Sequence, residues 1–158
     1  MAVRLMQVSD LEASAKIHKS AFIRQEQSFQ WLQCHLNAFP YCFCFVTESE
    51  KGILGYIIWT QKSGFRKEVV LELEQLAILE SEQGKGIGRG LITESLALIK
   101  KHLSSHDCSL KNILVSTRHD NSAQKLYQSV LGAEVEAMLT DLYSADEVIM
   151  IARNMNFQ

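Results

Sequence analysis

Apolar and polar residues follow one another along the chain in patterns that predict a strand and then two helices in its first quarter. Residues 3–8 form a short apolar strand. Ser9 and Glu12 have the spacing of a capping box, so the first helix is expected to begin near Ser9. Apolar residues at helical spacing predict a second helix over residues 27–38, and Pro40 ends it.

The rest of the chain alternates between strand-like and helix-like patterns. Strands are predicted over residues 41–47, 53–61, 68–79, 113–117, 133–139 and 147–154. Helices are predicted over residues 86–102 and again from Asn121 onward. The first two of these strands form an antiparallel hairpin, and the last two form another strand pair. We therefore expect one α/β (α+β) domain over residues 1–158, with a mixed, mostly antiparallel twisted sheet of about seven strands and about four flanking helices.

A glycine-rich stretch joins the strand over residues 68–79 to the helix that follows it. Glycine recurs there at every second position, at Gly84, Gly86, Gly88 and Gly90. The first N–H groups of a helix lack partners within the helix, and together with the helix dipole they attract anions. Glycines also let a ligand approach the backbone closely. The stretch is therefore predicted to hold phosphates, although it matches neither the P-loop nor the dinucleotide pattern.

The run Gln83-Gly84-Lys85-Gly86-Ile87-Gly88 resembles motif A of the GCN5-related N-acetyltransferase (GNAT) family, Gln/Arg-x-x-Gly-x-Gly/Ala. The resemblance implies that this loop cradles the pyrophosphate of acetyl-coenzyme A, and it implies a sheet with splayed central strands. It also implies that the pantetheine arm pairs with the backbone of residues 76–78, where a free N–H at Ala77 or Ile78 stabilises an oxyanion. The implied cofactor-binding residues in this region are Leu76, Ala77, Ile78, Gln83, Gly84, Lys85, Gly86, Ile87, Gly88 and Arg89.

A second stretch, from Asn121 to Gly132, resembles motif B of the same family, with one difference in spacing and with Ala133 in place of the usual phenylalanine. The resemblance implies that the side chain of Asn121 contacts the cofactor arm. It also places the phenol of Tyr127 near the sulfur of coenzyme A, where the departing thiolate needs a proton. Tyr127 is thus both a cofactor-binding and a catalytic candidate.

Two carboxylates on the strand before the glycines are candidates for the general base. Glu72 and Glu74 lie two residues apart, so their side chains point to the same face of the strand. An amine must lose its proton before it attacks, and a carboxylate can accept that proton directly or through water. The family position matches Glu72 best, with Glu74 as its neighbour, and the sequence leaves the choice between them open.

The composition of the chain argues against several classes of protein. The chain has 158 residues, 47% of them hydrophobic and 22% charged, with a formal net charge of −2. This charge argues against general binding of nucleic acid, and no apolar run is long enough to span a membrane. The N-terminus lacks the pattern of a signal peptide, so a cytoplasmic location is expected. The four cysteines are expected to be free thiols, and no metal site is expected.

Together these features predict an acyltransferase: an N-acetyltransferase that moves an acetyl group from acetyl-coenzyme A to a primary amine of a small molecule or peptide by direct attack. Acidic residues Asp141 and Asp146, in a loop that the family uses to select acceptors, would suit a cationic amine. Two alternatives stay open, namely a protein N-terminal or ribosomal-protein acetyltransferase and a non-catalytic regulatory module that binds acyl-coenzyme A. The sequence identifies neither the acceptor nor the oligomeric state, and a homodimer is compatible with it.

Overall fold

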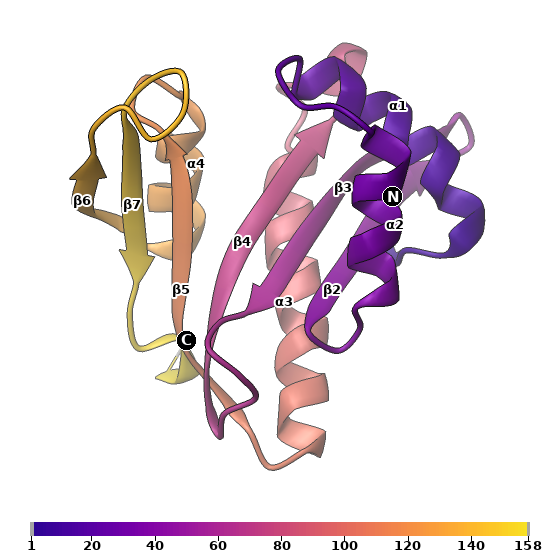
Figure 1. Ribbon diagram of the computed structural model, residues 1–158. Helices are drawn as coiled ribbons and strands as arrows, with labels where there is room; N and C mark the ends of the chain where they lie inside the picture. Colours follow the sequence, from indigo (N-terminus) through magenta and orange to yellow (C-terminus); the bar gives the residue numbers. More distant parts are fainter. Residues whose placement is uncertain (1, 158) are drawn as a thin grey trace. The chain divides into compact units, whose positions relative to one another are not determined.

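The computed structural model describes residues 2–157, which contain seven strands and four α-helices (Figure 1). The strands are β1 (Ala2–Leu5), β2 (Cys42–Ser49), β3 (Gly52–Gln61), β4 (Glu68–Ile78), β5 (Ser109–Arg118), β6 (Glu134–Leu139) and β7 (Glu147–Ala152), and the α-helices are α1 (Leu11–Ala21), α2 (Ser28–Asn37), α3 (Ile87–Ser105) and α4 (Ala123–Leu131). The strands form one sheet in the order β1-β2-β3-β4-β5-β7-β6. The β4–β5 pair is parallel, whereas β1–β2, β2–β3, β5–β7 and β6–β7 are antiparallel. This confirms the mixed, mostly antiparallel sheet that the sequence predicts.

The chain divides into two compact units. The first unit contains the residues up to Thr60 together with Gln75–Ile99, and the second contains Gln61–Glu74 together with the residues from Lys100 onward. Strand β4 and helix α3 each pass from one unit into the other. The expectation of a single domain over residues 1–158 stays a prediction. Within residues 2–157 no helix has the length and apolar character that crossing a bilayer requires.

In the first unit, the two faces of β3 carry different side chains because successive residues of a strand point in opposite directions. Tyr56 and Ile58 belong to a buried cluster with residues of α1 and α2, including Leu32. Trp59 points the other way, where its indole N–H donates to Ser95 of α3 over 2.9 Å. Figure 1 accordingly shows α1 and α2 on one face of β2 and β3 and α3 on the other.

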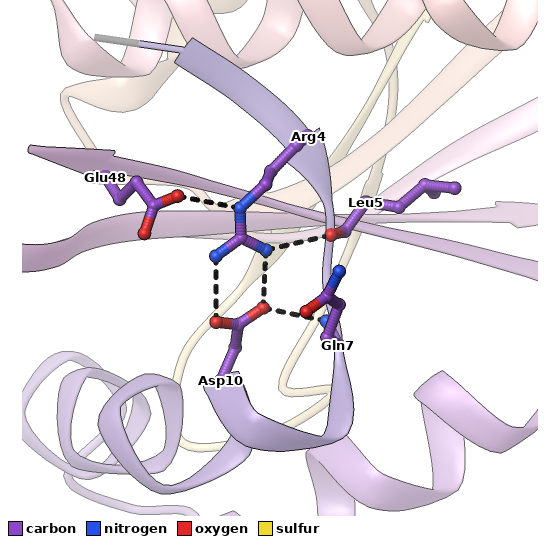
Figure 2. Close-up of polar contacts among 5 residues, drawn as sticks. All are labelled: Arg4, Leu5, Gln7, Asp10 and Glu48. Atoms are coloured by element: carbon purple, nitrogen blue, oxygen red, sulfur yellow. Dashed lines mark hydrogen bonds and ion pairs between the residues drawn. The ribbon is translucent and has the colours of Figure 1, made fainter.

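The start of α1 is held by a network of hydrogen bonds around the side chain of Arg4 (Figure 2). The Arg4 guanidinium donates to both carboxylate oxygens of Asp10, over 2.7 and 3.0 Å, and to Glu48 over 2.8 Å. Asp10 also accepts the backbone N–H of Gln7 over 2.7 Å. A 3-10 turn, Val8–Asp10, therefore precedes α1, which begins at Leu11. The expected helix start at Ser9 is wrong because Asp10, drawn to Arg4, caps the turn instead.

In the second unit, β5 forms a central strand. It pairs in parallel with the start of β4, from Glu68 opposite Ser109 to Glu72 opposite Leu114, and in antiparallel with β7 along its second half. Helix α4 follows β5 and ends at Gly132, whose φ of 69° is the left-handed conformation that favours glycine. This helix carries Tyr127, which is buried.

Candidate active site

The loop between β4 and α3 has the open backbone that the sequence predicts. A short 3-10 turn, Glu80–Glu82, follows β4, and Gly84 and Gly86 then have φ angles of 76° and 82°. A Cβ atom at either glycine would meet no atom within 4 Å. The glycines are therefore required by their backbone conformation, and the surface above them is clear for a ligand.

The amide groups of this loop are oriented for binding rather than for internal structure. Within residues 2–157, the backbone N–H groups of Gly84, Lys85 and Gly86 donate to no protein acceptor. They are followed at once by the first turn of α3, whose N–H groups also lack partners within the helix. Lys85 pairs with Glu82 over 3.1 Å, so the main-chain amides, more than the lysine charge, provide the positive character of the loop. Such an arrangement fits a diphosphate.

A glycine that the sequence analysis missed lets the start of α3 pack close to the sheet. At Gly55 of β3, an ideal Cβ would lie 2.8 Å from both the carbonyl oxygen of Ala77 and Cδ1 of Ile78, and 3.3 Å from Cδ1 of Leu91. Real Cβ atoms are not found this close to other atoms, so only glycine fits. Its signal in the sequence is weak, since an isolated glycine in a strand indicates a close backbone approach without naming the partner.

The end of β4 distinguishes between the two candidate oxyanion donors. The N–H of Leu79 donates to the carbonyl oxygen of Leu54 in β3 over 2.8 Å. Because neighbouring residues of a strand direct their N–H groups to opposite edges, the N–H of Ala77 also points to β3. The N–H of Ile78 points to the opposite edge of β4. The geometry thus favours Ile78 over Ala77 as a donor to a ligand.

A partly buried network of polar side chains, also not predicted from the sequence, supports this end of β4. Gln75 accepts hydrogen bonds from Trp31 Nε1 and from the hydroxyl of Tyr56, both over 3.0 Å, and it donates to Gln25 over 3.0 Å. Gln25 in turn bonds Nε2 of His18 over 2.8 Å. Burial lowers the pKa of His18, so the imidazole is neutral at pH 7. His18 is therefore a buried structural residue.

The two carboxylates proposed as bases are on β4 as predicted, and they alternate with buried residues such as Leu73. Glu72 is half-buried, and it forms an ion pair with Nζ of Lys62 over 3.0 Å. Glu74 has the same parity along the strand and is also half-buried. The structure therefore leaves both carboxylates as candidates for the base, with the Lys62 ammonium beside Glu72.

The second predicted motif, from Asn121 to Gly132, contains helix α4 of the second unit and the residues just before it. Asn121 accepts the N–H of Ala123 over 2.9 Å and donates to Oγ1 of Thr117 over 3.1 Å. It therefore joins β5 to α4 whatever else it contacts. Tyr127 lies on α4, and burial raises the pKa of its phenol to about 12. The phenol is consequently protonated at neutral pH, as a general acid must be.

In the acidic loop between β6 and β7, one of the two carboxylates forms a hydrogen bond within the loop. Oδ1 of Asp146 accepts the N–H of Asp141 over 2.9 Å, and its carbonyl oxygen accepts the N–H of His119 over 3.0 Å. Asp141 is exposed. Within residues 2–157 no group of three or more His, Cys, Asp or Glu residues is arranged to hold a metal ion.

A comparison of the sequence with models of protein families identifies the family of this chain. Residues 40–130, more than half of the chain, match the model of an acetyltransferase (GNAT) domain. The chain belongs to the GNAT acetyltransferase family. No curated protein matches this GNAT chain in sequence.

Solved structures with the same fold are numerous. An aminoglycoside 6′-N-acetyltransferase complexed with coenzyme A has a TM-score of 0.76 at 11% identity, covering 98% of each chain. A mutant spermidine N-acetyltransferase from Vibrio cholerae has a TM-score of 0.76 at 20% identity, covering 98% of this chain and 95% of its own. A ribosomal-protein-alanine N-acetyltransferase from Brucella melitensis has a TM-score of 0.73 at 19% identity, covering 97% of this chain and 99% of its own. These similarities show the GNAT fold and leave the acceptor open.

The predicted site residues of this GNAT chain fall into two groups. The backbone of residues 76–78 and the loop over residues 83–89 belong to the first unit, whereas Glu72, Glu74, Asn121 and Tyr127 belong to the second. Within the first group, the structure brings the end of β4 and the glycine loop together through Gln83, whose side-chain amide donates to the carbonyl oxygen of Ile78 over 3.4 Å.

Proposed function

We propose that the protein is an N-acetyltransferase that moves the acetyl group of acetyl-coenzyme A to a primary amine of a small molecule or peptide. The observation that supports this most strongly is the glycine loop at the start of α3, where the amides of residues 84–86 donate to no acceptor in the described part of the chain and the space above Gly84 and Gly86 is open. The same stretch lies inside the matched family model. The main-chain groups from Gly84 to Arg89 would hold the diphosphate, while Lys85 and Arg89 add positive charge.

Bound acetyl-coenzyme A supplies an activated thioester acyl group. The chain's own groups are assigned as follows: the N–H of Ile78 donates to the carbonyl oxygen, and Glu74 or Glu72 accepts the proton of the amine. Tyr127 donates a proton to the departing sulfur. Burial raises the pKa of its phenol to about 12, so the hydroxyl is protonated at neutral pH.

Direct attack by the amine is favoured over a thiol intermediate. Cys42 and Cys44 are buried, and burial raises the pKa of Cys44 to about 12. A thiol with this pKa contains almost no nucleophilic thiolate at neutral pH. The proposed acceptor class is supported by the family and by the names of similar structures, which include an aminoglycoside, spermidine and a ribosomal protein. A cytoplasmic location fits such substrates.

The test is release of coenzyme A when the protein is incubated with acetyl-coenzyme A and a panel of amines and peptides. We expect turnover with at least one primary amine and intersecting double-reciprocal lines. Gly86→Ala should raise KM for acetyl-coenzyme A. Gly52→Ala is its matched control, because Gly52 also has a positive φ and no atom within 4 Å of its Cβ position. Binding of coenzyme A without release on any amine would show a regulatory module instead.

A further inference from the structure

A basic hollow lies beside the loop that leads into β4. Its volume is about 570 Å³, and the polar residues that line it are Lys62, Ser63, Arg66, Lys67, Glu68 and Lys111. All of these belong to the second unit, and none belongs to the glycine loop. Pockets of this volume are large enough for a small-molecule ligand.

The backbone around the basic hollow is fixed by hydrogen bonds. The N–H of Lys62 donates to the carbonyl oxygen of Val70, and the N–H of Ser109 donates to that of Lys67, each over 2.8 Å. The Arg66 side chain folds back onto the loop, where Nε donates to the carbonyl oxygen of Ser63 over 2.9 Å. This leaves the terminal nitrogens of a positioned guanidinium for other acceptors.

Three of the four cationic side chains of the basic hollow form no ion pair within residues 2–157, and the fourth, Lys62, pairs with Glu72. Four cationic side chains line it against one carboxylate, Glu68, although the whole chain has a formal net charge of −2. In the part of the chain that the structure describes, Arg66, Lys67 and Lys111 form no ion pair. Converging cations repel one another, so an anion that enters the hollow relieves this repulsion as well as forming hydrogen bonds.

We propose that the basic hollow binds a small anion with two or more adjacent phosphate groups. A guanidinium presents paired donors that match phosphate oxygens, and lysine ammonium groups add point charges around them. Several cations in one concave site match several linked charges better than a single monoanion. A nucleic acid would instead require a continuous basic stripe, which four cations around one hollow do not form.

The ion pair between Lys62 and Glu72 connects the basic hollow to a neighbouring carboxylate. An anion in the hollow and the Glu72 carboxylate compete for the same ammonium group. Glu72→Gln removes this competitor and one negative charge, so the variant should bind the anion several-fold more tightly than the unmodified protein. This readout measures binding alone and does not depend on any activity.

The experiment is calorimetric titration with sodium tripolyphosphate at constant ionic strength, without coenzyme A, because the diphosphate of coenzyme A would compete for the basic hollow. We expect a saturable site that depends on the residues of the hollow. The double variant Arg66→Gln/Lys111→Gln should weaken it at least about tenfold, because charge-assisted hydrogen bonds are lost. The double variant Lys19→Gln/Lys51→Gln removes the same charge at exposed positions and should bind as before.

Amide shifts in the unmodified protein provide a second readout that needs no variant, since tripolyphosphate should move the signals of residues 62–68 and 111. The absence of saturable binding, equal weakening in both double variants or shifts confined to other residues would each overturn the proposal. It would also be overturned if a single-stranded oligonucleotide bound the same residues more tightly than tripolyphosphate.

Discussion

Tyr127 keeps its proton far above neutral pH because its phenol is buried, which raises its pKa to about 12. Burial therefore keeps the phenol protonated at neutral pH, which a proton donor requires. The raised pKa alone does not favour transfer to a thiolate, whose conjugate acid has a lower pKa. The acid role therefore needs a test that separates turnover from binding of the cofactor.

Replacing Tyr127 with phenylalanine removes the proton donor and little else. We expect kcat to fall by about a hundredfold or more, the usual contribution of a positioned acid, with KM for acetyl-coenzyme A nearly unchanged. Steady-state kinetics at saturating amine measures both. Tyr41→Phe, at a half-exposed tyrosine, is the control and should retain full turnover. An unchanged kcat in Tyr127→Phe would exclude the acid role.

Asp10 leads to a prediction of how the free energy of unfolding depends on pH. Its hydrogen bonds with Arg4 hold the pKa of its carboxyl below the ordinary value, so its stabilisation is full above the unfolded pKa of about 3.9 and is lost as pH falls through the lower folded pKa. Asp10→Asn should lower the free energy of unfolding by about 2 kcal/mol at pH 7.

Chemical denaturation at a series of pH values measures this difference, which should shrink towards zero as the solution is acidified below the unfolded pKa. Glu12→Gln, in an exposed ion pair with Lys16 at 3.9 Å, should change stability little at any pH. A deficit in Asp10→Asn that stays constant with pH would show that packing, and not the charge, is responsible.

At the scale of elements, the site depends on how firmly α3 is anchored to β3 and β4. Leu91 is fully buried one turn into the helix, Gly55 provides the space beneath it, and Trp59 bonds Ser95 one turn further on. These contacts hold the first turn of α3 against the end of β4. The amides of the loop between them are therefore preorganised before a ligand arrives.

The close packing of α3 on Gly55 can be tested with a substitution that adds a side-chain atom there. Gly55→Ala should lower the free energy of unfolding by about 1–3 kcal/mol, because the added carbon overlaps backbone and buried atoms of β4. Gly90→Ala is the matched control, since its Cβ would make only an ordinary contact at 3.8 Å within α3, and it should stabilise the helix by up to about 1 kcal/mol. Equal effects of the two substitutions would show that the close approach at Gly55 has no structural role.

Local patterns were sufficient to predict the elements but not their side-chain partners. The strand over residues 68–79, observed as β4 (Glu68–Ile78), and the glycine loop follow from periodicity and backbone chemistry close in sequence. The hydrogen bonds of Gln75 could not be predicted, because its partners Trp31 and Tyr56 come from distant elements. The helix start expected near Ser9 lies at Leu11 instead, because the attraction of Arg4 for Asp10 cannot be read from a capping pattern.

At the scale of the whole molecule, the parallel strand pair and the family match fall on the same part of the chain. The β4–β5 pair is the one parallel pair among those described above, and the matched region over residues 40–130 contains β4, α3, β5 and most of α4. Every predicted site residue lies on these elements or in the loops between them. The acceptor is part of the proposal, because a fold alone does not determine a substrate.

The central claim is that backbone amides at the start of α3 bind a diphosphate. The most direct measurement is a crystal structure of the protein soaked with coenzyme A. The account predicts the diphosphate within hydrogen-bond distance of the N–H groups between Gly84 and Arg89. A diphosphate bound to any other part of the chain, with these amides turned to solvent, would contradict it.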